Sequence, residues 1–199
     1  MDCTLLVSGW QLFFQTWTLT GLPVVSEDRI LNVLNDLGNR FSDKPLTDSP
    51  VASAVRARFR EAGTDPTKYR PSFEALARRI LRGDPFPRVH PAVDLSNLLS
   101  LLWEVPCCVA DLVKIEPPVQ LRIGAPGEEM VSLRGPIHLE GKILLEDRQG
   151  PYSTPITDSK RASVSGVTKS VSFVAYVPQG FLDEDRFRRN LKEMGLLGP

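Results

Sequence analysis

Two parts of this sequence carry side chains that could act chemically on a ligand. Ser96 and Asn97 supply a hydroxyl and an amide beside an apolar segment, and Cys108 supplies a thiol further along. Asp158 could act as a base, and Arg161 could clamp a carboxylate or a phosphate. These residue types favour polar recognition and acid–base chemistry, although the chain lacks the generic serine-hydrolase, phosphate-loop and zinc-protease signatures.

The same side chains also allow a structural interpretation. Ser96 and Asn97 could do no more than cap the helix in which they lie, because hydroxyl and amide groups bond readily to the local backbone. Asp158 and Arg161 could pair with each other in a solvated turn. Both interpretations stay open for these four residues.

Cys108 has two interpretations that differ in their chemistry. It could be a nucleophile with His90 as its base, which requires the two side chains within hydrogen-bonding reach and a partly exposed, electropositive thiol. It could also be a small buried apolar residue. The three cysteines do not suggest a disulfide framework, and the two histidines do not complete a zinc site, so we expect no metal and no other cofactor.

Helices are predicted first along the chain and strands later, which favours an α+β domain. The most apolar helix is predicted between Pro91 and Pro106, and its apolar residues cover every side of the helical wheel. We therefore expect a helix that is buried all round, with Ser96 and Asn97 near its entrance. The other helices are predicted at 26–40, 50–63, 71–83 and 181–194.

Short strands are predicted on both sides of these helices. They lie at 4–7, 11–20, 108–113, 120–123, 130–133, 142–146 and 171–177. The first two are expected to pair with each other across Gly9. The polar stretch 152–167 is a long loop, and such loops are usually either functional or disordered.

Composition indicates one medium-sized domain with an ordinary soluble balance. Its 199 residues can bury a core, no apolar run is long enough to cross a bilayer, and no signal peptide is recognisable, so the expected compartment is the cytoplasm. Basic and acidic residues both total 24, which counts against a large non-specific RNA surface. A local patch remains possible at Arg78, Arg79 and Arg82, which a solvated helix face would also explain.

Several motifs, in order along the chain, resemble one known family. They are the stretches 65–72, 93–97, 108–112, 127–135 and 157–161. These residues resemble the editing and tRNA-binding domain, the B-three/B-four (B3/4) domain, of the bacterial phenylalanyl-tRNA synthetase beta subunit. The resemblance is closer to free-standing proteins that consist of this domain alone. It implies one domain over 1–199, with 1–45 and 179–199 as loosely matching extensions.

The resemblance implies an α+β fold with a closed or nearly closed β-barrel or mixed sheet and helices packed outside. It also implies tRNA or aminoacyl-tRNA as the partner, with no membrane or DNA partner. The synthetase domain hydrolyses tyrosine wrongly attached to tRNA, using a Thr-Asn pair, a His and a Glu. On this chain the pair falls on Ser96 and Asn97, the His on Cys108 and the Glu on Val174.

From this resemblance we expect tRNA binding, with deacylation of mischarged aminoacyl-tRNA in trans as the reaction. The catalytic candidates are Asn97, Cys108 and Asp158. The expected substrate contacts are Ser96, Asn97, Cys108, Asp158, Arg161 and Val174, and the expected tRNA-phosphate contacts are Arg78, Arg79 and Arg82. The replaced His and Glu, together with zero net charge, favour the alternative of a non-catalytic binding module for an amino-acid-like metabolite or a protein partner.

Overall fold

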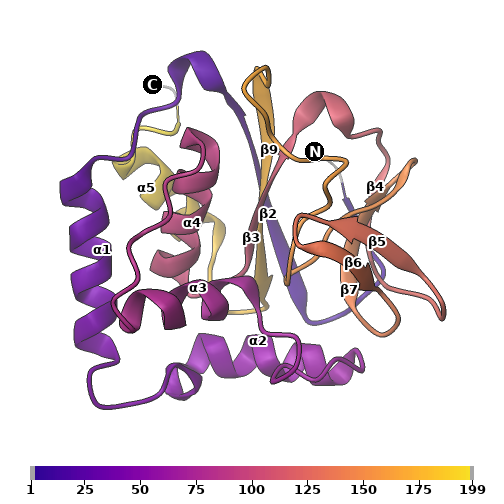
Figure 1. Ribbon diagram of the computed structural model, residues 1–199, viewed down its shortest axis with the longest axis horizontal. Coiled ribbons are helices and arrows are strands. Elements are labelled where there is room, and N and C mark those ends of the chain that lie inside the picture. Colours follow the sequence, from indigo (N-terminus) through magenta and orange to yellow (C-terminus); the bar gives the residue numbers. More distant parts are fainter. Residues whose placement is uncertain (1–2, 198–199) are drawn as a thin grey trace.

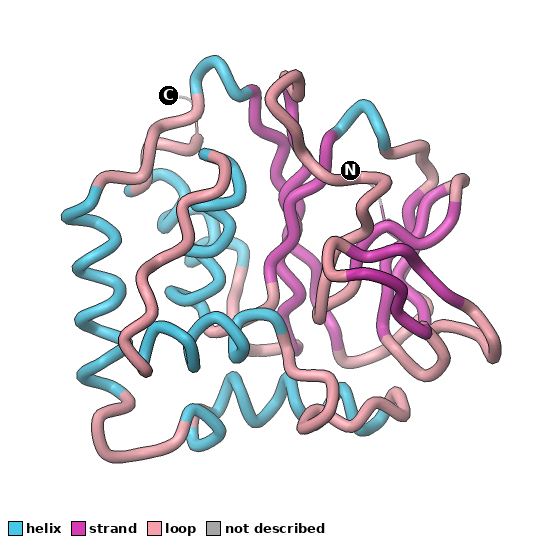
Figure 2. Tube along the Cα trace, in the orientation of Figure 1, coloured by secondary structure: helices cyan, strands magenta, loops and turns pink. Residues whose placement is uncertain are grey.

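A central three-stranded antiparallel sheet divides the molecule into two halves (Figure 1). The computed structural model describes residues 3–197. The sheet has the order β2 (Trp10–Thr18), β9 (Ser170–Pro178) and β3 (Cys107–Asp111). Helices cover one face, and the remaining strands lie against the other, as the colours of Figure 2 make clear.

The helical half forms around one buried helix, α4 (Pro91–Trp103). Its leucines at 95, 98, 99 and 101 are almost completely buried and pack with residues of β9, so the predicted core helix is confirmed. The other helices lie close to their predicted bounds. They are α1 (Glu27–Arg40), α2 (Pro50–Glu61), α3 (Ser72–Leu81) and α5 (Glu184–Glu193).

Local capping explains where two of these helices begin. The Ser26 side chain accepts the Arg29 backbone N–H at α1, and the Ser49 side chain accepts the Ala52 N–H at α2. Helix α2 runs along one end of the central sheet (Figure 1) and contributes Val55 and Phe59 to the core of the strand-rich half. Among residues 3–197, none of the helices combines the length and apolar character of a membrane span.

The strand-rich half contains a four-stranded sheet and a separate hairpin. The sheet has the order β1 (Cys3–Leu5), β4 (Val119–Ile123), β7 (Ile143–Asp147) and β8 (Gly150–Ser153). The hairpin is β5 (Glu129–Ser132) with β6 (Gly135–His138). Side chains of both larger sheets, including Leu121, Leu145 and Tyr176, meet in one core.

Three expectations about the strands are wrong. The first two strands do not pair with each other, because the chain turns at Gly9 (φ +79°) and places β1 beside β4 and β2 beside β9. Strands β6 and β8 were missed because each begins with a Gly-Pro pair, which is typical of turns. The mixed α+β architecture is confirmed, but no sheet within residues 3–197 closes into a barrel, since the strands are divided among separate sheets.

Candidate functional site

A cavity of about 180 Å³ lies between α4, β3 and the loop that follows β8. We call it the α4 cavity. Its lining residues are Val89, Val93, Ser96, Asn97, Cys107, Val109, Leu133, Asp158, Ser163 and Val164. Three of the predicted site residues, Ser96, Asn97 and Asp158, therefore meet at one place. A cavity of roughly 150 Å³ binds benzene, so this one has room for a small ligand group and not for a nucleotide.

The start of α4 is capped by residues other than Ser96 and Asn97. The His90 ring accepts the Ala92 N–H at 3.3 Å, and Asp94 Oδ1 accepts the Val89 and His90 N–H groups at 2.8 and 3.2 Å. Within residues 3–197, the Ser96 and Asn97 side chains make no hydrogen bond to the protein. Their polar groups remain available to whatever occupies the cavity.

Asp158 ends a chain of hydrogen bonds from the central sheet. Ser153 Oγ donates to Asp158 Oδ1 at 3.0 Å. Because a serine hydroxyl has one hydrogen, the Tyr176 hydroxyl must donate to Ser153 Oγ across their 2.7 Å contact. Burial raises the pKa of Asp158 to about 6, although hydrogen bonds from Cys108 and Ser153 oppose this effect. At neutral pH the group is therefore mostly a carboxylate that can still accept a proton.

The loop that carries Asp158 is ordered by hydrogen bonds to its own backbone N–H and carbonyl groups. The Thr154 hydroxyl accepts the Ile156 and Thr157 N–H groups at 3.2 and 2.9 Å. The Leu133 N–H donates to the Asp158 carbonyl at 3.0 Å, which ties the loop to the hairpin. This part of the predicted long loop thus forms a defined wall of the cavity.

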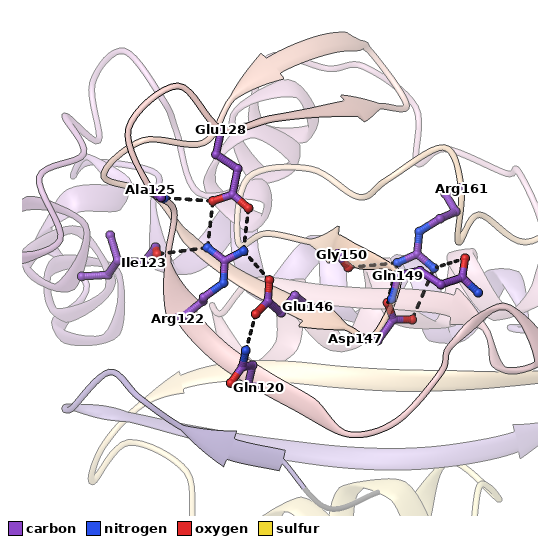
Figure 3. Close-up of polar contacts among 10 residues, drawn as sticks. All are labelled: Gln120, Arg122, Ile123, Ala125, Glu128, Glu146, Asp147, Gln149, Gly150 and Arg161. Atoms are coloured by element: carbon purple, nitrogen blue, oxygen red, sulfur yellow. Dashed lines mark hydrogen bonds and ion pairs between the residues drawn. The ribbon is translucent and has the colours of Figure 1, made fainter.

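Arg161 is not among the residues that line the cavity. Figure 3 shows its guanidinium group held by Asp147, Gln149 and Gly150. Its two terminal nitrogens lie 2.9 and 3.3 Å from the Asp147 carboxylate oxygens, and the Asp147 side chain is fully buried. The predicted turn pair between Asp158 and Arg161 is therefore not formed. Arg161 instead joins its loop to β7 through a buried ion pair.

A second ion-pair cluster in the same view was not anticipated from the sequence. Arg122 of β4 binds Glu128 and Glu146, and Glu146 also accepts from Gln120 (Figure 3). The hydrogen bonds from Arg122 hold the pKa of both glutamates below the ordinary value. This cluster ties β4 to β7 and to the turn that leads into the hairpin. It lies outside the α4 cavity lining.

Cys108 and Val174 lie on the opposite face of the central sheet. They are paired across β3 and β9, and both are buried in the core of the strand-rich half. Because side chains alternate along a strand, Cys107 faces the cavity. Burial raises the pKa of both cysteine thiols well above the ordinary value. With His90 capping α4, the arrangement needed for a cysteine nucleophile is not formed.

A second cavity, of about 310 Å³, lies beside α3 and is strongly basic. We call it the basic groove. Its lining residues are Lys44, Pro45, Leu46, Arg70, Arg78, Leu81 and Arg82. Of the predicted phosphate contacts, Arg78 and Arg82 line it, and Arg78 also pairs with Glu74 at 3.0 Å. Arg79 does not line the groove and pairs with Asp84 at 3.2 Å. Arg70 belongs to the same basic stretch of the sequence, whereas Lys44 was missed because it comes from a separate loop. A concave surface lined by one sign of charge attracts anions.

The α4 cavity lies between the core helix and the central sheet and is lined by both polar and aliphatic side chains. Comparison with known proteins identifies the family. The sequence model of the B3/4 domain matches residues 54–194, and the chain belongs to this family, which confirms the predicted resemblance.

Among solved structures, the chain is similar to an N-terminal fragment of the phenylalanyl-tRNA synthetase beta subunit from Pyrococcus horikoshii. The identity is 21% and the TM-score is 0.43. The similarity covers 53% of this chain and 40% of that fragment, so this chain spans less than half of it. No curated protein matches the chain.

Proposed function

We propose that this domain binds the aminoacyl end of a tRNA and holds the amino acid in the α4 cavity. One observation carries the proposal. The cavity brings the polar groups of Ser96, Asn97 and Asp158 together against an aliphatic wall, with the first two free of protein partners within residues 3–197. Membership of the B3/4 family supports a role related to tRNA synthetases.

The basic groove is the proposed contact for tRNA phosphates. Arg70 lies at one end of α3, where the Ser72 N–H donates to the Pro155 carbonyl at 2.9 Å. Pro155 belongs to the loop that carries Asp158, so this hydrogen bond joins the start of α3 to the loop that forms one wall of the cavity. Lys44, Arg70, Arg78 and Arg82 would bind the backbone while the cavity, too small for a nucleotide, takes the amino acid.

The proposed reaction is hydrolysis of the ester that joins the amino acid to the tRNA. Asp158 positions the aminoacyl group, a water adds to the ester carbonyl, and the Asn97 amide donates to the developing oxyanion. The carbonyl–oxygen bond then breaks, giving the free amino acid and the tRNA hydroxyl, which takes up a proton from the attacking water. Cys108, Val174 and Arg161 have supporting roles in this scheme, because they hold the sheet and loop on which the cavity is built.

The test is deacylation of a panel of correctly and wrongly charged tRNAs by the full chain. We expect one charged species to be lost, and Asn97→Ala and Asp158→Asn each to slow that loss at least tenfold. Asp43→Asn, an exposed aspartate outside both cavities, is the matched control and should behave like the unchanged protein. If no tRNA is bound or deacylated, the proposal is wrong.

A non-catalytic binding module is the second candidate. The small volume of the α4 cavity, with the basic groove as a separate hollow, favours an amino-acid-like ligand that needs no RNA. Binding of such a ligand without turnover of any charged tRNA would select this function.

A further inference from the structure

Within the described part of the chain, no cation pairs with the negative charge of Asp158. Buried carboxylates elsewhere face a basic side chain: Glu74 lies 2.9 Å from Arg56, and Asp147 lies 2.9 Å from Arg161. Within residues 3–197, no lysine, arginine or histidine lines the α4 cavity or forms an ion pair with Asp158. Its hydrogen-bond donors are all neutral groups.

The titratable groups around Asp158 do not change this balance at neutral pH. They are Cys107 and Cys108 of β3, Tyr152 of β8 and Tyr176 of β9. Burial raises the pKa of all four, so each stays uncharged. The cavity therefore presents one carboxylate, three neutral polar side chains and an aliphatic wall.

We propose that the α4 cavity recognises the ammonium group of an amino acid whose carboxyl is esterified or amidated and whose side chain is small and aliphatic. This inference rests on the proposed function and specifies its substrate class. The ammonium would supply at Asp158 the cation that arginines supply at Glu74 and Asp147.

The missing cation also argues against a free amino acid. Its own carboxylate would enter the same small cavity as Asp158, and like charges at short distance repel. An ester or amide has no such charge, and Ser96 and Asn97 can donate hydrogen bonds to its neutral carbonyl.

The side-chain preference follows from the cavity wall. Five of its residues are aliphatic, and none is aromatic: Val89, Val93, Val109, Leu133 and Val164. A volume of about 180 Å³ suits a valine-sized or leucine-sized group together with the ammonium. Tyrosine would bring a larger ring and a hydroxyl, so the preferred side chain differs from the one that the synthetase domain removes.

Four small probes, L-valinamide and three comparison compounds that include L-tyrosinamide, test each part of the proposal on the full chain. L-valinamide has the ammonium and a neutral carbonyl, L-valine adds a carboxylate, and N-acetyl-L-valinamide lacks the ammonium. Binding is measured by NMR titration, which detects millimolar affinities, with Asn97 and Val109 as reporters. We expect L-valinamide to bind at least tenfold more tightly than L-valine or N-acetyl-L-valinamide. It should also bind more tightly than L-tyrosinamide, which carries an aromatic side chain.

Variants then assign the charge recognition to Asp158. Asp158→Asn should weaken L-valinamide binding on the order of tenfold to a hundredfold, while Asp43→Asn should leave it unchanged. The asparagine can still accept the Ser153 hydrogen bond, so the variant keeps the local geometry. Equal binding of L-valine and L-valinamide, an unaffected Asp158→Asn variant, or no binding of any amide would each overturn the inference.

Parallel assays with charged tRNA separate this inference from the proposed function. If Asp158-dependent L-valinamide binding occurs but no tRNA is bound, the ligand class stands and the tRNA function is wrong. If a charged tRNA is deacylated equally by the unchanged protein and by Asp158→Asn, deacylation of tRNA stands, whereas the ammonium site and the role of Asp158 in the reaction are wrong.

Discussion

Replacing Asp158 by asparagine should stabilise this protein above pH 6 and have little effect near pH 4. The pKa of the carboxyl is raised from 3.8 to about 6 by burial, with Cys108 and Ser153 acting in the opposite direction. Below 3.8 both the folded and the unfolded chain hold the proton. Between pH 3.8 and about 6, the folded chain keeps the proton on Asp158 while the unfolded chain releases it, so the free energy of unfolding falls as the pH rises. Above about pH 6 the folded chain has lost all of the stability that this proton supplied.

The size of the effect follows from the two pKa values. A difference of about two in pKa corresponds to about 3 kcal/mol in the free energy of unfolding. The side chain is partly exposed at the cavity, so solvent screening reduces this to about 1–2 kcal/mol. Asparagine removes the charge and keeps an acceptor for Ser153, so the variant should be more stable by that amount at pH 8.

Urea unfolding of the protein and the variant, at several values between pH 4.5 and pH 8, measures the effect. Other carboxylates titrate in the same range, but they are common to both proteins and cancel in the difference. A pH-independent difference for Asp158→Asn, or a variant that is less stable at pH 8, would refute the reasoning.

Three further predictions concern other parts of the molecule. Arg161→Ala should lower the free energy of unfolding by about 3 kcal/mol, because it leaves the buried Asp147 carboxylate without its cation. Urea unfolding tests this, and a change below about 1 kcal/mol would contradict it. Leu99→Ala should lower it by about 2–5 kcal/mol through a cavity in the core of α4, and a variant as stable as the unchanged protein would contradict that packing. Arg82→Ala should reduce the salt dependence of tRNA binding by about one phosphate contact. Arg79→Ala should change it less, because Arg79 is already paired with Asp84. Equal effects of the two substitutions would argue against the basic groove.

Local sequence signals were enough to place the helices. Ser26 and Ser49 cap helices whose apolar residues recur at helical spacing, and these features depend only on neighbouring residues. The all-round apolar pattern of α4 identified the core element, and the positions of Ser96 and Asn97 on it indicated one side of the cavity. Asp158 came from the family resemblance and from its place in a polar loop.

Long-range pairing decided what the sequence could not. Cys107 and Cys108 are adjacent, and a shift of one residue in the register of β3 exchanges which of them faces the cavity. Arg161 was expected to serve a ligand, but its partner Asp147 lies on another strand, and no local pattern indicates that contact. Lys44 and Arg70 meet in the basic groove because of tertiary packing between two loops.

The raised pKa of Asp158 connects folding, proton uptake and ligand binding through one group. The folded chain holds a carboxylate where water and cations are scarce, and this opposes folding at neutral pH. A ligand ammonium at that position would compete with a proton for the same oxygen atoms, so ligand affinity should fall as the pH drops below about 6. It would also stabilise the folded chain, because the ligand binds the folded state alone. The Glu74 and Asp147 carboxylates are neutralised permanently by Arg56 and Arg161, so these ion pairs have a structural role. Asp158 has no such fixed partner, and its surroundings therefore suit a site where a ligand binds and leaves.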